Sequence, residues 1–247
     1  VCGYAAKPPL LIEILKESET AFWIYTDIIL AGDLCPVINQ YANNSLIVAE
    51  EPKTERVFGS EKTVSWGFAA GRTLAFGINS CFIRATRSHS RLLHSWLDLL
   101  CSPTFQCAQA MDWRDRPRHA FSDQDVLESL LCSKQFADVP IQPLITGRDI
   151  AQCFYADGYS ATERLRNALR GTPPLVHCQG PKSWISPKNR AIALDLSPYN
   201  YVARQYSTQL NDSSWMYPTT LFGQVLDIVF FQHPSLSGLL PAAIMGI

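Results

Sequence analysis

Hydrophobic residues along this chain alternate between the spacing of helices and the spacing of strands. Residues 7–16 place apolar side chains at positions 10, 11, 14 and 15 beside a proline pair, which predicts a helix. The run 21–25 is short, apolar and aromatic, and it is followed by Thr26 and Asp27. We interpret this run as a buried central strand, because strands covered on both faces are continuously apolar.

The alternation continues to residue 177. Strands are predicted at 46–49, 78–84 and 175–177, and helices at 88–100, 123–131 and 161–170. Segment 35–45 is typical of turns, whereas the charged segment 50–63 and the glycine-containing segment 65–77 are typical of loops. Alternating helices and strands favour an α/β layered domain over an all-α or all-β one.

Composition and charge narrow the class of protein. The 247 residues are 47% hydrophobic, and 21 Lys and Arg balance 22 Asp and Glu to a net charge of -1. This balance excludes the basic excess of a nucleic-acid-binding protein, so an anionic ligand would be held by a few local cations and backbone amides. From the length we expect one large domain with an appendage: a domain over 1–190 and an aromatic, apolar C-terminal extension over 191–247.

Cysteines and the chain ends bear on location. The eight cysteines include no C-x-x-C pair, which favours reduced core thiols, expected at Cys2, Cys35, Cys81 and Cys178. No signal-peptide pattern opens the chain. The tail 228–247 has no Asp, Glu, Lys or Arg but is interrupted by Pro and Gly, which predicts docking on the domain or contact with a membrane surface or partner. We expect a cytoplasmic protein, at the membrane face if the tail binds lipid, with the Golgi lumen as the alternative.

Polar residues lie where predicted strands end and loops or helices begin: Asp27, Asn79, Asp123, Gln124, His177 and Lys182. Carboxylate and imidazole groups could hold a divalent ion, and a lysine beside a glycine could neutralise phosphate. The sequence contains no serine-hydrolase elbow, Walker loop, dinucleotide fingerprint or H-E-x-x-H helix. The acidic, amide and basic residues at these positions therefore suit a reaction with a diphosphate leaving group.

In this order, the motifs resemble those of the GT-A nucleotide-sugar glycosyltransferases, especially the glycogenin and bacterial galactosyltransferase type. The resemblance covers about residues 4–185 and rests on Lys7-Pro8, the segment 22–28, the segment 79–82, Trp96, Asp123-Gln124 and the His177-x-x-Gly180-x-Lys182-x-Trp184 motif. It implies a mixed, mostly parallel sheet flanked by helices. It also implies transfer of a sugar from a nucleotide-diphosphate donor, a UDP-sugar first of all, to a glycan or other hydroxyl acceptor, with retention of configuration.

The resemblance implies a role for each site residue. The metal ligands for Mn²⁺ or Mg²⁺ would be Asp27 and His177. Catalysis would involve Asp123 as the carboxylate near the reacting carbon and Gln124 as its neighbour. The donor would be bound by Asn79, Gly180, Lys182 and Tyr25.

Departures from the family pattern leave two other interpretations open. Tyr25 stands where the family has the first Asp of D-x-D, Cys81 replaces a glycine, and the histidine motif is one residue short. The family's first nucleotide-binding strand would precede residue 1, so either the chain is incomplete or it departs from the family at the base-binding site. The alternatives are a non-catalytic nucleotide-sugar or glycan-binding module, and an interaction domain that uses its apolar C-terminus.

Overall fold

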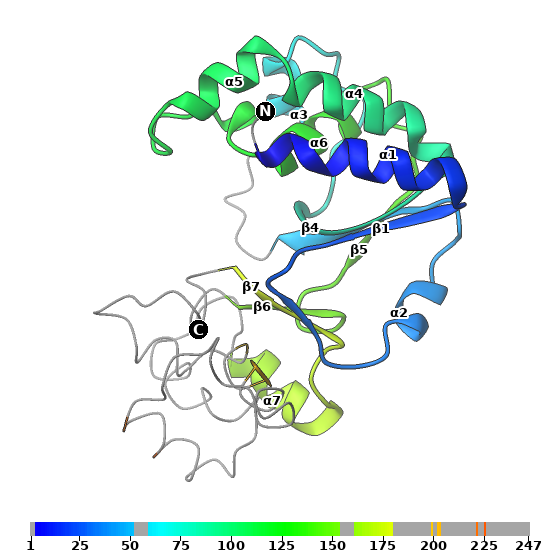
Figure 1. The fold of residues 1–247 in the computed structure, drawn as a ribbon. Helices are drawn as coiled ribbons and strands as arrows, with labels where there is room; N and C mark the ends of the chain where they lie inside the picture. The colour runs from blue at the N-terminus through cyan, green and yellow to red at the C-terminus, as the bar shows by residue number, and fades with distance from the viewer. Residues whose placement is uncertain are drawn as a thin grey trace. The chain divides into compact units, whose positions relative to one another are not determined.

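The computed structural model describes residues 3–51, 59–153 and 161–179 and the single positions 199, 202, 203, 221 and 225. Contacts divide the chain into two units (Figure 1). Unit 1 is Val1–Ile24 with Asn39–Leu144, and unit 2 is Tyr25–Ile38 with Ile145–Ile247. Both contain helices and a mixed sheet, so the α/β class is confirmed. The predicted domain boundary at residue 190 lies outside the described residues.

Unit 1 is built on a four-stranded sheet in the order β1-β4-β3-β5. Its strands are β1 (Thr20–Ile24), β3 (Leu46–Glu51), β4 (Gly77–Thr86) and β5 (Ile141–Leu144). Strand β4 runs antiparallel to β1 and β3, and β3 runs parallel to β5. The long strand β4 is buried from Gly77 to Ala85, so it forms the centre of this unit.

Strand β1 lies at the edge of the sheet, so the prediction of a buried central strand at 21–25 is wrong. Only Ala21 is buried in β1, and Phe22 is 44% exposed. The run is apolar because its large side chains are partly buried against neighbouring residues. Trp23 packs against the core, and the ring of Phe22 makes an edge contact with that of Phe82, at 6.2 Å between centroids.

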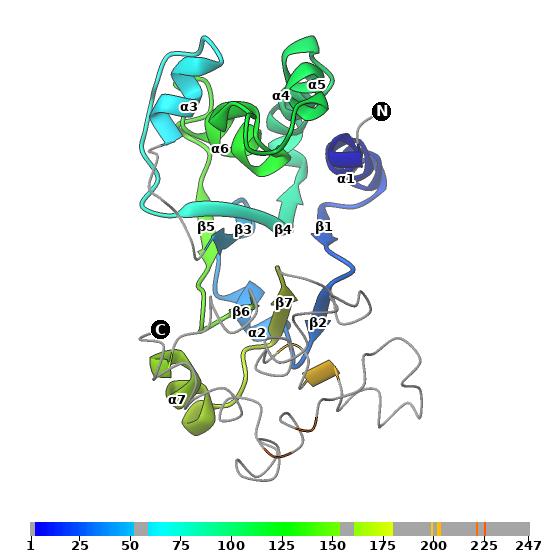
Figure 2. The ribbon, with the colours of Figure 1, turned by 90° about the vertical axis from the view of Figure 1, so that its left-hand side faces the viewer.

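Helices α1 (Lys7–Glu17), α4 (Ser90–Leu100) and α6 (Asp123–Leu131) cover one face of this sheet (Figures 1 and 2). The structure confirms the predicted helices in all three places, with a short 3-10 turn, Arg87–His89, ahead of α4. Leu11, Trp96 and Phe105 lie completely buried in the core. Phe105 belongs to α5 (Pro103–Ala110), a helix that the sequence did not predict.

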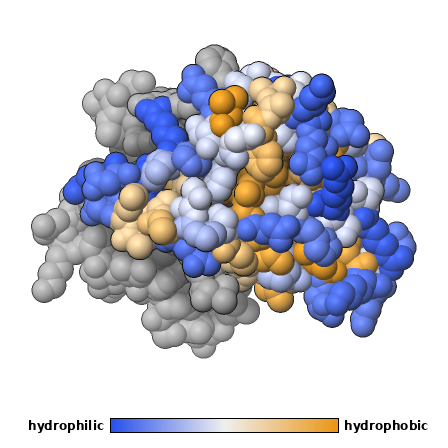
Figure 3. All heavy atoms as spheres, turned by 90° about the horizontal axis from the view of Figure 1, so that it is seen from above, coloured by the Kyte–Doolittle hydropathy of each residue, from blue (hydrophilic) through white to orange (hydrophobic). Residues whose placement is uncertain are grey.

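Helix α1 buries only part of its apolar stripe. Leu11 and Leu15 reach the core, whereas Leu10 and Ile14 are exposed. Hydrophobic side chains accordingly reach the surface among hydrophilic ones when the molecule is viewed from above (Figure 3).

Helix α3 (Gly59–Ser65) replaces part of a predicted loop. Its one large apolar residue, Val64, is 62% exposed, so the helix has no hydrophobic stripe that a periodicity argument could detect. Polar contacts attach it to α6: the Thr63 hydroxyl donates to the backbone oxygen of Ser129, 2.7 Å away.

Unit 2 contains a three-stranded sheet in the order β2-β7-β6. Its strands are β2 (Ile28–Leu30), β6 (Ile150–Cys153) and β7 (Leu175–Cys178), with β7 antiparallel to β2 and parallel to β6. The predicted helix at 161–170 is confirmed as α7 (Ala161–Arg170). In the described part of the chain, no helix is long and apolar enough to cross a membrane.

The expectation of one mostly parallel sheet is wrong for the described strands. These form two sheets, and the pairs β1–β4, β3–β4 and β2–β7 are antiparallel, against the parallel pairs β3–β5 and β6–β7. The order of helices and strands does not specify strand direction. Direction depends on whether each connection returns the chain to the same end of the sheet, which gives antiparallel strands, or crosses to the opposite end, which gives parallel ones.

Segment 35–45 was expected to form turns, but it begins with a short helix, α2 (Cys35–Asn39), that has no buried residue. Cys35 is therefore exposed, and its expected place in the core is wrong. Cys81 and Cys178 are buried and form no disulfide, as expected, whereas Cys2 lies outside the described residues.

A buried arginine and a buried histidine organise the end of β4. The Nη2 atom of Arg84 donates to the backbone oxygens of Ala42 and Ser45, at 2.6 and 2.8 Å. His89 is 2% exposed, and its Nδ1 atom accepts from the backbone N–H of Thr86 at 3.0 Å. Burial first, and then the Arg84 charge, lowers the pKa of His89 below its ordinary value of 6.5.

We expect His89 to make stability fall as the solution becomes acidic. Its folded-state pKa is depressed, so the unfolded chain binds more protons as pH falls below 6.5, and the stability present above that pH is then lost. Urea unfolding at about pH 7.5 and about pH 5.5 measures the free energy of unfolding that is lost between the two pH values. This loss should be smaller in His89→Gln than in the unchanged protein, because the glutamine amide oxygen can accept from the same Thr86 N–H without titrating. Equal losses in both proteins would contradict the prediction.

Candidate functional site

Strand β4 interrupts its regular pairing in the middle of the unit 1 sheet. Val48 on β3 pairs with Ile83, but the next residue, Ala49, pairs with Asn79, so residues 80–82 of β4 are passed over. Strand β1 pairs with β4 from Phe82 to Thr86, so it reaches only the last of these three residues. Such irregularities release backbone groups from the sheet and redirect side chains, and they are common next to functional sites.

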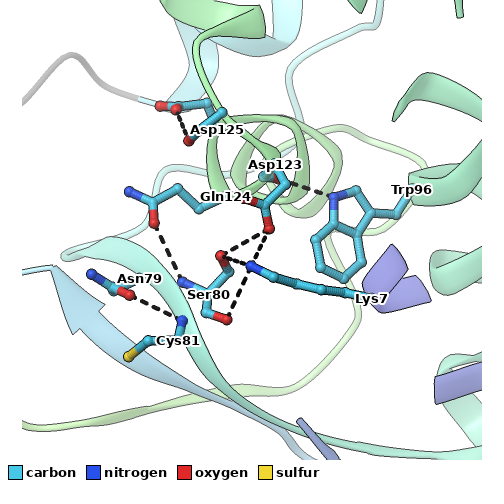
Figure 4. A network of polar contacts seen from close by, with 9 residues as sticks. Lys7, Asn79, Ser80, Cys81, Trp96, Asp123, Gln124 and Asp125 are labelled. Carbon is cyan, nitrogen blue, oxygen red and sulfur yellow. Dashed lines mark hydrogen bonds and ion pairs between the residues drawn. The ribbon is translucent and has the colours of Figure 1, made fainter. Parts of the chain in front are cut away.

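Side chains from three elements bind the released backbone (Figure 4). Gln124 on α6 accepts a hydrogen bond from the backbone N–H of Ser80 at 3.4 Å, and Lys7 on α1 donates to the backbone oxygen of Ser80, also at 3.4 Å. The Asn79 side-chain oxygen accepts from the N–H of Cys81 at 3.0 Å. The chain thus replaces sheet hydrogen bonds by one local contact, from Asn79, and by two contacts with residues that are distant in sequence, Lys7 and Gln124.

A buried ion pair lies at the centre of this group. The Nζ atom of Lys7 is 2.5 Å from Oδ2 of Asp123, and the two side chains are 3% and 2% exposed. The Ser80 hydroxyl lies 2.7 Å from Nζ and 2.9 Å from Oδ2, so it accepts from the lysine and donates to the carboxylate. The indole N–H of Trp96 donates to the backbone oxygen of Asp123 at 3.0 Å.

The ends of two helices explain why these charges are paired. Asp123 begins α6, where a negative charge interacts favourably with the helix dipole, but Lys7 begins α1, where a positive charge does not. Lys7 therefore requires a carboxylate nearby, and Asp123 supplies it. A lysine directly before a proline pair at a predicted helix start was the available sequence clue to this role.

Three further contacts hold the group from outside. The Asn79 amide donates to Glu51 Oε2 at 2.8 Å. On α6, Asp125 and Glu128 both bind Lys62 of α3, with 2.7 Å between Nζ and each carboxylate oxygen. Burial raises the pKa of Glu128, although the Lys62 charge opposes this shift. For Lys62, burial acts to lower the pKa, but the two carboxylates outweigh it, so the pKa of Lys62 is raised. The two ion pairs of Lys62 attach the first two turns of α6 to α3.

A second polar group lies in unit 2, on β7 and the turn before β2. His177 is 3% exposed, and its Nδ1 atom is 2.6 Å from Oε1 of Gln152 on β6. Its Nε2 atom is 3.5 Å from Oδ1 of Asp27, which is 8% exposed. Tyr25 makes an edge contact with the imidazole ring, at 6.1 Å between centroids.

The Asp27 and His177 side chains fit a pair of metal ligands. If the Gln152 oxygen accepts a hydrogen bond from Nδ1–H, the Nε2 lone pair faces the Asp27 carboxylate. Two ligand atoms each about 2.1 Å from one ion are about 3.0 Å apart at a right angle and about 3.4 Å apart at the tetrahedral angle. The observed 3.5 Å is close to this range. A histidine ligand commonly has its other nitrogen hydrogen-bonded in this way.

A full protein ligand set is absent from the residues that the structure describes: no three His, Cys, Asp or Glu side chains lie together as metal ligands would. Further ligands to an ion at Asp27 and His177 would therefore come from undescribed residues, a bound diphosphate or water.

The structure arranges the predicted site residues in two groups. Asn79, Asp123 and Gln124 come together in unit 1, and Tyr25, Asp27 and His177 come together in unit 2. Gly180 and Lys182 lie outside the described residues. Sequence reasoning assigned no site role to four residues that contact these groups: Lys7, Ser80, Glu51 and Gln152.

No protein-family model matches this chain, and no significant match was found among curated proteins or solved structures.

We expect Lys7→Met to destabilise unit 1 by about 3–5 kcal/mol, because it leaves the buried Asp123 charge uncompensated. The double variant Lys7→Met/Asp123→Asn should lose less stability than the sum of the losses in the two single variants. The difference, which is the coupling energy of the pair, should be about 1–3 kcal/mol. Urea unfolding of the four proteins measures this cycle. Lys16→Met is the control on the same helix, since Lys16 forms an exposed pair with Glu13 and should change stability by less than about 1 kcal/mol. Additive losses would rule out a direct interaction.

Proposed function

We propose that this chain is a glycosyltransferase that moves a sugar from a nucleotide-diphosphate donor to a hydroxyl acceptor. One observation carries the proposal: motif residues at positions 7, 79 and 123–124 belong to one polar network in unit 1 (Figure 4). These are the positions that the resemblance to GT-A glycosyltransferases assigned to the donor-sugar and acceptor pocket, apart from Lys7. Their meeting at an irregular, buried strand centre supports a shared function.

The network has the chemistry that a sugar site requires. Amide groups of Asn79 and Gln124 can both donate to and accept from sugar hydroxyls. The Asp123 carboxylate is fixed by Lys7 and Ser80, so its charge is held in one orientation at the start of α6. Because glycosyl transfer gives the sugar oxocarbenium character, a fixed carboxylate can stabilise the transition state electrostatically.

The group in unit 2 has the chemistry that a diphosphate site requires. Asp27 and His177 would hold Mn²⁺ or Mg²⁺, and the bound ion would neutralise charge on the departing nucleoside diphosphate. Gln152 would orient the imidazole, and Tyr25 would pack against it. Lys182, in the motif after His177, would contact phosphate.

The test is hydrolysis and transfer of UDP- and GDP-sugars with and without Mn²⁺. We expect metal-dependent turnover that falls about 100-fold in Asp27→Asn, because the variant removes one ionic ligand and the electrostatic stabilisation that depends on it. Asp98→Asn is the matched control, since Asp98 is an exposed carboxylate on α4 and its loss should leave turnover unchanged.

Thermal shifts on the same samples separate the remaining interpretations. A donor that binds the folded protein raises its melting temperature by mass action whether or not it reacts. Donor-induced stabilisation without turnover would favour the nucleotide-sugar-binding module. No stabilisation and no turnover with any donor would contradict both.

A further inference from the structure

Two cysteines face each other across the parallel strands of unit 2. Cys153 on β6 and Cys178 on β7 are partners in the strand register. Residues paired in this way in a parallel sheet point to the same face. The preceding pair, Gln152 and His177, contacts through side chains on the opposite face, as the alternation of a strand requires.

The contacts of the two cysteines agree with this orientation. Both belong to a hydrophobic cluster with Ala151 and Val176, which strand alternation places on the same face of the sheet, and with Tyr199. The two cysteine side chains therefore belong to the same buried apolar cluster.

The geometry of adjacent strands permits a bond between them. Neighbouring strands are about 4.8 Å apart, and disulfides join Cα atoms that are about 4.4–6.8 Å apart. The usual strand spacing thus lies within the range of Cα separations that a disulfide spans. In the structure neither residue forms a disulfide, and 0% and 3% of their surface is exposed.

We propose that Cys153 and Cys178 are a modification site, a buried dithiol that closes to a disulfide by exchange with a small disulfide such as oxidised glutathione. In the first step, one cysteine thiolate attacks glutathione disulfide and releases one glutathione thiolate, which takes up a proton. In the second step, the other cysteine thiolate attacks the protein-bound sulfur, forms the Cys153–Cys178 bond and releases the second glutathione. The protein loses two protons and two electrons, and one glutathione disulfide becomes two thiols.

The disulfide would act on the neighbouring polar group. It would join β6 to β7 one residue beyond Gln152 and His177 and so fix the register that holds their hydrogen bond. It would also close a loop through α7 and thereby stabilise unit 2 against unfolding. This inference stands on the strand register and does not depend on sugar transfer.

The test is to unfold the protein in urea and refold it in mixtures of oxidised and reduced glutathione, which gives the reagent access to the buried thiols. Remaining thiols are then alkylated and the chain is cut with trypsin. Each cysteine lies alone in its tryptic peptide, Cys153 in residues 149–164 and Cys178 in residues 171–182. We expect these two peptides to be linked, and the melting temperature of the oxidised protein to be higher than that of the reduced protein by roughly 5 °C or more.

Three results would overturn the proposal. The first is that both peptides are alkylated even in the most oxidising mixture. The second is that either cysteine is linked mainly to another cysteine or to glutathione. The third is that the Cys153–Cys178 link lowers the melting temperature. The control variant is Cys132→Ala, which removes a buried thiol of unit 1 and should leave the link intact. Cys178→Ala should abolish both the link and the redox dependence of the melting temperature, while the reduced variant remains folded as judged by circular dichroism.

Discussion

The centre of unit 1 depends on the buried pair of Lys7 and Asp123. Desolvating two charges is costly, and the cost is offset only when each has its partner and its hydrogen bonds. Here the Ser80 hydroxyl bridges the pair, and its backbone groups are bound by Lys7 and Gln124. The irregularity of β4, the start of α1 and the start of α6 are therefore interdependent, because each supplies a group that the others require.

The same principle applies to other polar groups of this nearly neutral chain. With a net charge of -1, its long-range field attracts little, so any recognition must come from charges fixed locally. The structure holds several polar side chains in place through buried partners: Asp123 by Lys7, Asp125 by Lys62, and His177 by Gln152 and Asp27. Each of these side chains has a defined orientation, which electrostatic catalysis requires.

Local patterns predicted the helices α1, α4, α6 and α7 and the strands β3, β4 and β7, because each carries apolar residues at a clear period or in a clear run. They did not predict α3, which is held by Lys62 and Thr63 instead of an apolar stripe. Nor did they predict that β1 is an edge strand, because aromatic residues such as Trp23 can be apolar and only partly covered. Strand order and direction depend on distant pairings, which no local pattern records.

The sequence indicated several of the residues that belong to the candidate site but not which side chains contact one another there. Asp123, Gln124 and Asn79 were recognised from motifs, whereas Ser80 became important only because β4 skips residues 80–82 in its pairing with β3. Likewise His177 was expected beside Asp27, but Gln152 on β6, which orients its ring, belongs to a strand that no pattern indicated. Register placed Gln152 beside His177, and the same register placed Cys153 beside Cys178. One strand pairing thus determines both the orientation of a candidate metal ligand and the chemistry available on the other face of the sheet.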